Sequence, residues 1–480
     1  MSLHALQVIK RGHLCPLKFK EEEKMIFKKS PFLHIFPVSN KYLAFYNSLS
    51  LELAFLEKDT IEKCMGYERF FPVDSESETI LKSLEKIGLI IPEESDGMDI
   101  YRFYKKKLEK PAINILYLLI TDACNLRCGY CYFLSNMEKN YKFSQMEESI
   151  AVKAIEMFSR CIKKSIAEGH KEQHIVLYGG EPTTNKKTLV ASLRFISSSK
   201  NNGSLPSDIG VTINTNGILL DGEIIEEAKR SNAIIAISID GPKDIHNQMR
   251  VDISGKGSFD RVIQSYYLAT SLGAKVGICV TIDRHNLYEA QNIINWLADT
   301  LKVKGLGFNI LIENETSNPN NYLHYSQEVA IQLVNCYRVA REKGVYEDRI
   351  MRRVKNFIEK TPVLSDCGGC GLQIVVSPDG QIGVCQAFCG SKKYFVSESM
   401  ESFEPTEHQF WKEWRNRSPL SMEECKSCIA LGNCGGGCPY NAYKIKGSIN
   451  ALDERFCMHA KTTVEFLIKD LWEKQKQEGI

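Results

Sequence analysis

The sequence lacks the features that mark membrane, secreted and nucleic-acid-binding proteins. Its longest uninterrupted apolar run, 115–120, has six residues, whereas a membrane-spanning helix needs about 20. The 61 basic and 59 acidic residues leave a net charge of +2, which gives no basic surplus for binding nucleic acid. No apolar segment near the N-terminus precedes the small residues of a secretion signal's cleavage site. We therefore expect a cytoplasmic protein without membrane or nucleic-acid partners.

The composition is otherwise that of a globular protein, except in cysteine. Charged residues make up 25% and hydrophobic residues 43% of the 480 residues, which argues against overall disorder and suggests about three domains. There are 17 cysteines. In a long cytoplasmic chain, such a number indicates metal binding rather than disulfide bonds. The scattered Cys161, Cys279 and Cys336 lie in apolar patterns, and we interpret them as buried hydrophobic residues.

The middle of the chain alternates short apolar segments with amphipathic ones. Six apolar segments begin near residues 113, 174, 209, 233, 275 and 306, each followed by a helix-like pattern. This alternation is typical of the α/β class, with a parallel sheet and helices outside it. A closed barrel of this kind needs eight units. We therefore predict an open, partial (β/α)6 barrel over residues 111–345.

Polar motifs follow the first four predicted strands. They are the loop of Cys124, then Gly-Gly-Glu-Pro at 179–182, Asn-Thr-Asn-Gly at 214–217 and Ser-Ile-Asp-Gly-Pro at 238–242. In parallel β/α folds the chemistry lies on the loops at the carboxyl ends of the strands. We therefore expect all four motifs to face one cavity.

Residues 1–105 have a different pattern. Residues 30–57 are predicted to form an extended segment followed by an apolar helix. Residues 78–89 are predicted to form a helix that ends at Gly88, and a short strand is expected at 90–92. These elements favour a small winged-helix-like domain. The alternative is an N-terminal extension packed on the barrel.

The first cysteine cluster offers three thiolates within eight residues. Cys124, Cys128 and Cys131 have the spacing C-x3-C-x2-C. A structural zinc ion and a cubane iron–sulfur cluster bound only by protein each need four ligands. Three cysteines would leave one iron of a cubane open to an external ligand. A zinc site is the alternative.

The string CNLRCGYCY at 124–132 resembles the signature of radical S-adenosylmethionine (SAM) enzymes, with Tyr130 in the aromatic position before the last cysteine. The resemblance implies that SAM chelates the open iron, and that its one-electron cleavage to methionine gives a 5′-deoxyadenosyl radical, which abstracts a hydrogen atom. It also implies that 179–181 hold the methionine amino group, and that residues at later strand ends lie near the ribose or carboxylate. The cofactor-binding residues expected on this basis are Tyr130, Gly179, Gly180, Glu181, Asn216 and Ser238.

A further string links Asp240 to His246 and Arg250, in a pattern common in the peptide-modifying branch of that family. For His246 and Arg250, a solvated loop is the alternative interpretation. The sequence assigns no catalytic role to any residue, and the base of the reaction stays unknown.

Nine cysteines lie between residues 367 and 457: Cys367, Cys370, Cys385, Cys389, Cys425, Cys428, Cys434, Cys438 and Cys457. A proline follows Cys438, and in two-cluster ferredoxins such a cysteine ligates the other cluster. This predicts crossed ligation. One auxiliary cluster takes Cys367, Cys370, Cys385 and Cys438, and the other takes Cys425, Cys428, Cys434 and Cys457. Cys389 could replace Cys370, or one iron could stay open; zinc sites in a ribbon-like module are a further alternative.

Residues 346–480, with SPDGQIGVC at 377–385, look like the loop-rich iron–sulfur SPASM domain of radical SAM peptide maturases. The resemblance implies three [4Fe-4S] clusters, SAM, and an external electron donor of the flavodoxin or ferredoxin type. It implies a ribosomally made precursor peptide as substrate, with its leader bound by residues 1–105. We expect hydrogen abstraction from that peptide and a crosslink, a thioether from a Cys thiol.

Three other functions remain open. The first is a carbon–carbon crosslinking peptide cyclase. The second is an anaerobic sulfatase maturase, which forms formylglycine. In that subfamily, the residue directly after the cysteine that corresponds to Cys385 is an Asp, which serves as the base. This chain has Gln386 instead, and an amide cannot take a proton at neutral pH. The third is a non-catalytic iron–sulfur electron carrier, which would need no open three-cysteine site beside Gly-Gly-Glu-Pro.

Overall fold

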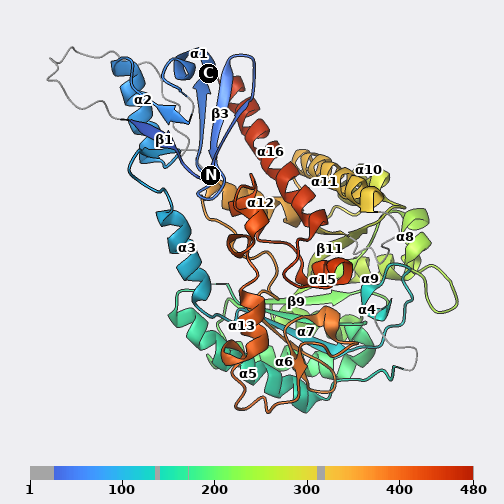
Figure 1. Ribbon diagram of the computed structural model, residues 1–480. Helices are drawn as coiled ribbons and strands as arrows, with labels where there is room; N and C mark the ends of the chain where they lie inside the picture. The colour runs from blue at the N-terminus through green and yellow to red at the C-terminus, as the bar shows by residue number, and fades with distance from the viewer. Residues whose placement is uncertain (1–25, 67, 136–140, 171, 311–318, 479–480) are drawn as a thin grey trace.

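The computed structural model describes residues 26–66, 68–135, 141–170, 172–310 and 319–478 (Figure 1). Its main element is a ten-stranded sheet with the order β13-β12-β11-β10-β9-β8-β7-β14-β15-β16. In chain order the strands are β7 (Ile115–Thr121), β8 (His174–Gly179), β9 (Gly210–Thr215), β10 (Ile234–Ser238), β11 (Lys275–Ile282), β12 (Gly305–Ile310), β13 (Tyr346–Glu347), β14 (Gln373–Val376), β15 (Ile382–Gly383) and β16 (Phe395–Val396). The pairs β14–β15 and β15–β16 are antiparallel, and all other neighbours in this sheet are parallel.

The helices that follow these strands complete the predicted units. They are α5 (Glu148–Ala167), α6 (Lys186–Asn201), α7 (Gly222–Arg230), α8 (Lys243–Met249), α9 (Phe259–Ser271), α10 (Ala290–Asp299) and α11 (Pro319–Glu342). The α/β class is confirmed, and the linear order of the described strands gives an open sheet, as expected for a partial barrel. Strand residues such as Leu116, Leu118, Ile175, Leu177 and Ile213 are fully buried. Strands of a parallel sheet are commonly buried on both faces, which explains their near-continuous apolar runs.

The sheet includes four strands from residues 346–480, β13 to β16, that the sequence did not predict. Strand β14 pairs parallel with β7, in a register that sets Gln373 opposite Ile115. It lies between Cys370 and Cys385 in the chain. The C-terminal cysteines are therefore anchored beside the strand that leads into the first cysteine loop.

The N-terminal part contains two small antiparallel sheets and helix α2 (Ser75–Lys86). The sheets are β2 (Leu33–Pro37), β3 (Tyr42–Asn47) and β4 (Leu53–Glu57), and then β5 (Arg69–Phe70), β1 (Phe27–Lys29) and β6 (Ile90–Pro92). The expected helix and the strand at 90–92 are present, but the apolar helix expected within 30–57 is wrong. Leu43 and Phe45 of β3 pack in one core, whereas Ala44 and Tyr46 pack in another. A strand buried on both faces loses its alternating pattern and cannot be told from a helix by periodicity. The likeness to a winged helix stays a prediction.

The C-terminal helix α16 (Glu454–Gln477) packs against the N-terminal sheet of β2, β3 and β4. In Figure 1 it runs from the loops near the barrel to the N-terminal strands. The Trp472 ring lies 4.8 Å from the Tyr42 ring and 5.2 Å from the Phe55 ring, centroid to centroid. The N-terminal sheet therefore shares an apolar core with α16. No helix in the described part of the chain is long and apolar enough to cross a membrane.

Candidate functional site

The first cysteine loop leaves the carboxyl end of β7 and ends at the short helix α4 (Tyr132–Ser135). Burial, the charge of Glu181 and the thiols of Cys128 and Cys131 together raise the pKa of Cys124 to about 12. The three thiols are thus close enough to interact. Such thiols lose their protons when they bind a metal, and this donor set fits an iron–sulfur cluster with one open iron.

A Gly-Gly pair at the end of β8 packs against the start of this loop. The amide N–H of Gly180 donates to the Thr121 carbonyl at 2.9 Å, and that of Glu181 donates to the Ala123 carbonyl at 2.8 Å. A Cβ on Gly179 would lie 2.0 Å from the Thr121 oxygen, and one on Gly180 would lie 2.2 Å from the Ala123 oxygen. Only glycine allows the two backbones to approach this closely.

Gly180→Ala is therefore expected to displace the cysteine loop. Its Cβ would meet backbone atoms, which cannot move as a side chain can, and overpacking of this kind costs about 1–3 kcal/mol. We expect a lower Tm and the loss of about four iron atoms per reconstituted chain, measured by calorimetry and iron analysis. Gly222→Ala is the matched control, because nothing lies within 4 Å of its added Cβ. Full iron content in Gly180→Ala would contradict this role.

Glu181 is 1% exposed, and its carboxylate accepts hydrogen bonds from other residues of the protein. Its Oε1 accepts hydrogen bonds from the Thr183 amide at 3.1 Å, the Thr183 hydroxyl at 2.6 Å and the Thr215 hydroxyl at 2.6 Å. Its Oε2 accepts from the Asn216 amide at 2.6 Å. Burial raises the pKa of Glu181, while these donors lower it. The side chain thus orders the end of β9; a contact with a methionine amino group stays a prediction.

The other predicted cofactor residues lie on the same edge of the sheet. The Asn216 side-chain amide donates to the Asn125 side-chain oxygen at 2.7 Å, so it contacts the cysteine loop directly. Ser238 is the last residue of β10 and is partly exposed. Their roles near the ribose or carboxylate of SAM stay predictions.

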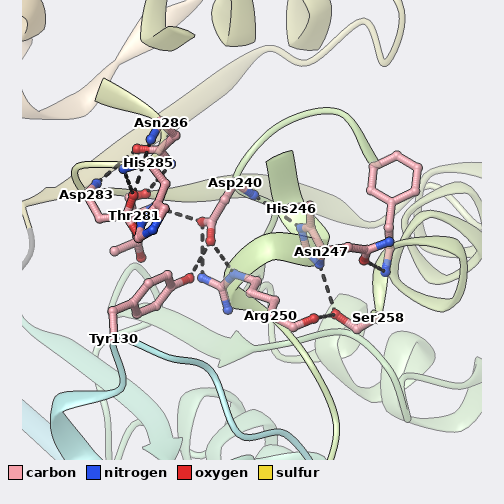
Figure 2. A network of polar contacts seen from close by, with 11 residues as sticks. Tyr130, Asp240, His246, Asn247, Arg250, Ser258, Thr281, Asp283, His285 and Asn286 are labelled. Carbon is pink, nitrogen blue, oxygen red and sulfur yellow. Dashed lines mark hydrogen bonds and ion pairs between the residues drawn. The ribbon is translucent and has the colours of Figure 1, made fainter. Parts of the chain in front are cut away.

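Tyr130 is held by Asp240 and Arg250, which follow strand β10 in the chain (Figure 2). Its hydroxyl donates to Asp240, and the Arg250 guanidinium lies over its ring, 5.4 Å from the centroid. His246 is fully buried and Arg250 is 7% exposed. The solvated loop considered for His246 and Arg250 is therefore wrong: the ion pair of Arg250 with Asp240 compensates for burying the charge.

The first predicted auxiliary set is gathered near β14. Burial raises the pKa of Cys367 well above its usual value, and the thiols of Cys370, Cys438 and Cys385 raise it further. Cys389 is also buried, but the charged groups that shift its pKa are Lys392, Asp122 and Asp379, and no thiol is among them. The electrostatic neighbours of Cys367 thus include Cys370 and not Cys389; the ligand set itself stays a prediction.

The second predicted set is gathered where α14 (Leu431–Cys434) meets the start of α16. Burial and the thiols of Cys434 and Cys428 together raise the pKa of Cys425 to about 12. Burial also raises the pKa of Cys457 to about 12, with contributions from Cys425 and Cys428. The four thiols of each predicted set are thus neighbours.

All cysteines in the described residues are free thiols, and Cys15 lies outside them. Within the same residues, no group of three or more His, Cys, Asp or Glu side chains is arranged to hold a single metal ion. The ligands of an iron–sulfur cluster bind separate irons, so they need not meet at one point.

Three tyrosines without a predicted role lie between the first cysteine loop and the C-terminal cysteines. The hydroxyls of Tyr132 and Tyr178 are 3.0 Å apart, and the rings of Tyr117 and Tyr178 meet edge to face at 6.1 Å. Burial and Tyr178 raise the pKa of Tyr132, and the thiols of Cys385 and Cys131 add to this. In the sequence, Tyr117 and Tyr178 are hidden within apolar strands. A phenol within an apolar strand is the one signal in the sequence that could have singled them out.

Residues 118–297 match the family model of the Radical SAM superfamily. The chain is 25% identical over 432 residues to the radical SAM cyclopropyl synthase TigE of Paramaledivibacter caminithermalis, covering 85% of this chain and 86% of that protein. It is 24% identical over 342 residues to a cysteine-type anaerobic sulfatase-maturating enzyme of Clostridium perfringens, covering 68% and 89%. The solved structure of native anSMEcpe with bound AdoMet and Cp18Cys peptide has the same fold, with a TM-score of 0.62, 19% identity, and coverage of 76% and 99%.

Proposed function

Because the chain contains a radical SAM domain at 118–297, we propose that it modifies a ribosomally made precursor peptide. It abstracts a hydrogen atom from that peptide and forms a crosslink, a thioether from a Cys thiol to a carbon atom. The observation that carries this proposal is the arrangement of the thiols. Three thiols lie together after the end of β7, and two groups of four thiols lie in residues 346–480.

Eleven cysteines would hold three [4Fe-4S] clusters, and SAM would bind beside the first. Together, SAM and the first cluster supply a 5′-deoxyadenosyl radical. Cys124, Cys128 and Cys131 would leave one iron open, and Asn216 and Ser238 would orient SAM from the ends of β9 and β10. The rings of Tyr117 and Tyr178 contact each other, Tyr117 lies near Cys367 and Cys385, and these tyrosines would contact the peptide.

A thioether bond requires a definite balance of atoms. Joining a C–H carbon to a thiol sulfur removes one hydrogen atom, one proton and one electron. SAM bound at the first cysteine loop would supply the acceptor for the hydrogen atom, and a cluster held by the auxiliary thiols would accept the electron. An external donor of the flavodoxin or ferredoxin type would reduce the first site. The base that takes the proton is not assigned.

The test uses the reconstituted full chain with SAM, a reductant and the peptide encoded beside its gene. A product lighter by two hydrogens, with a new crosslink located by fragmentation, supports the proposal. Deuterium at the crosslinked carbon should appear in 5′-deoxyadenosine. A peptide of unchanged mass, at full iron content and with active SAM cleavage, would refute it.

Sulfatase maturation is the second candidate, favoured by the similarity to the Clostridium perfringens enzyme. Against it stands Gln386, whose side-chain oxygen accepts from the side-chain amide of Gln373 at 3.2 Å; Gln386 offers no carboxylate as a base. The same assay separates the two, because formylglycine formation removes the sulfur of the substrate Cys, whereas a thioether retains it.

The proposed leader-binding role of residues 1–105 predicts competition in trans. A leader peptide would add a strand to a sheet edge of this domain. Excess free leader should therefore inhibit turnover of the full precursor severalfold, and leave turnover of a leaderless core peptide and uncoupled SAM cleavage unchanged. Deleting the domain is a poorer test, since it would expose Trp472 and the core around it. Equal turnover with and without free leader would refute the role.

A further inference from the structure

We infer that Asp240 and Arg250 are positioning residues for the first cysteine loop. Asp240 holds Tyr130 of that loop, and Arg250 stands beside Cys128 as a fixed positive charge that favours the reduced state of the site. The inference rests on the proposed cluster at Cys124, Cys128 and Cys131.

The carboxylate of Asp240 is the centre of the network (Figure 2). Its Oδ2 accepts from the Tyr130 hydroxyl and from Arg250 Nε, the latter at 2.7 Å. Its Oδ1 accepts from the Thr281 amide at 2.9 Å and from Arg250 Nη2 at 3.3 Å. Asp240 is 2% exposed. One buried carboxylate therefore joins the cysteine loop, the segment after α8 and strand β11.

The segment that contains Arg250 also pairs with the cysteine loop through its backbone. The Arg127 amide donates to the Val251 carbonyl at 2.7 Å, and the Gly129 amide donates to the Met249 carbonyl at 2.9 Å. These bonds lie on either side of Cys128 in the chain. Displacing the 249–251 segment would therefore move Cys128 with it.

His246 and Ser258 fix this segment from the other side. His246 Nδ1 accepts from the Asp240 amide at 3.3 Å, so Nε2 carries the proton and donates to the Ser258 hydroxyl at 3.0 Å. That hydroxyl donates in turn to the Arg250 carbonyl at 2.9 Å. Every polar group in this chain of contacts has a partner, which suits a rigid support rather than a mobile loop.

The position of Arg250 also has an electrostatic effect. Arg250 lies between Met249 and Val251, whose carbonyls bond the backbone amides on either side of Cys128, and its guanidinium lies 5.4 Å from the centroid of the Tyr130 ring in the same loop. A buried positive charge interacts strongly in a medium of low polarity. It stabilises the state that carries one more electron, and its removal should shift the reduction potential to more negative values.

The test compares variants of the reconstituted full chain. The readouts are iron content, the EPR signal that changes when SAM is added to the reduced protein, its midpoint potential, and KM for SAM. Arg250→Gln should shift the midpoint potential to more negative values. Arg250→Lys should keep the potential close to that of the unaltered protein, because it retains the positive charge. Tyr130→Phe keeps the ring, and should weaken the SAM-dependent change in the signal and raise KM for SAM severalfold.

Two control variants make the same chemical change elsewhere. Tyr266→Phe removes a buried hydroxyl that donates to the Leu301 carbonyl at 2.8 Å. Arg194→Gln breaks an ion pair with buried Glu227 on the outer helices. Both should leave the signal, the potential and KM unchanged, whatever happens to Tm.

Variants at Tyr130 and Arg250 that match these controls in all readouts would overturn the inference, even if their Tm falls. If Arg250→Gln does not fold, Tyr130→Phe decides alone. Cys128→Ser distinguishes a failure of the proposed cluster site from a failure of the positioning role. If it keeps the SAM-sensitive signal, the proposed cluster site itself fails; if it loses the signal while the other variants behave normally, only the positioning role fails.

Discussion

Cys128→Ala is expected to abolish formation of 5′-deoxyadenosine, and Cys124→Ala and Cys131→Ala should do the same. A cluster with one open iron needs all three thiolates of the loop, since losing one leaves two ligands for four irons. The three thiols are neighbours at the end of β7. Iron analysis should show about eight rather than about 12 atoms per chain, and chromatography should show no 5′-deoxyadenosine above the level without enzyme.

Cys161→Ala is the matched control for this prediction. Cys161 is 8% exposed on helix α5, and no other cysteine is among the groups that shift its pKa. Its replacement should leave iron content and SAM cleavage unchanged, apart from a small loss of stability. Normal SAM cleavage in Cys128→Ala would remove the basis for a radical SAM site in this loop.

Cys457→Ala is expected to cost one auxiliary cluster and to abolish peptide modification. Crossed ligation makes Cys457 the fourth ligand of the set that contains Cys425 and Cys428, and these thiols are neighbours in the structure. Iron should fall from about 12 to about eight atoms per chain. Some uncoupled SAM cleavage should persist, because Cys457 lies on helix α16, outside the first cysteine loop.

Cys389→Ala tests the choice of ligands in the same experiment. Cys389 is fully buried, yet no thiol is among the groups that shift its pKa. Its replacement should leave about 12 iron atoms, whereas Cys370→Ala should lose about four. The reverse result would exchange the two cysteines in the proposed ligand set. Full iron in Cys457→Ala would refute crossed ligation.

Much of the barrel could be predicted because its signals are local. The strand–helix units follow from the lengths and periods of apolar segments, and the spacing of Cys124, Cys128 and Cys131 lies within eight residues. The crossed grouping of Cys438 and Cys457 also has a local signal, the proline after Cys438. The structure brings together the same thiols that the spacing grouped.

The errors arose where a residue's environment depends on distant segments. Strand β3 is buried on both faces because α16 covers one of them, so its apolar run resembled a helix. His246 and Arg250 looked like loop residues, because their polar character favours solvent unless a partner is buried with them. That partner, Asp240, is bound in turn by Tyr130 from the first cysteine loop.

The sequence by itself determined the α/β class, the order of the strand–helix units and the positions of three cysteine groups. Each of these depends on spacing and periodicity within a few tens of residues. The tertiary structure alone placed β14 beside β7, packed α16 on the N-terminal sheet and buried Asp240 and Arg250 together. These arrangements depend on contacts between segments more than 100 residues apart or on which face of an element is covered. No local pattern records such contacts, because burial and charge pairing are properties of the folded chain.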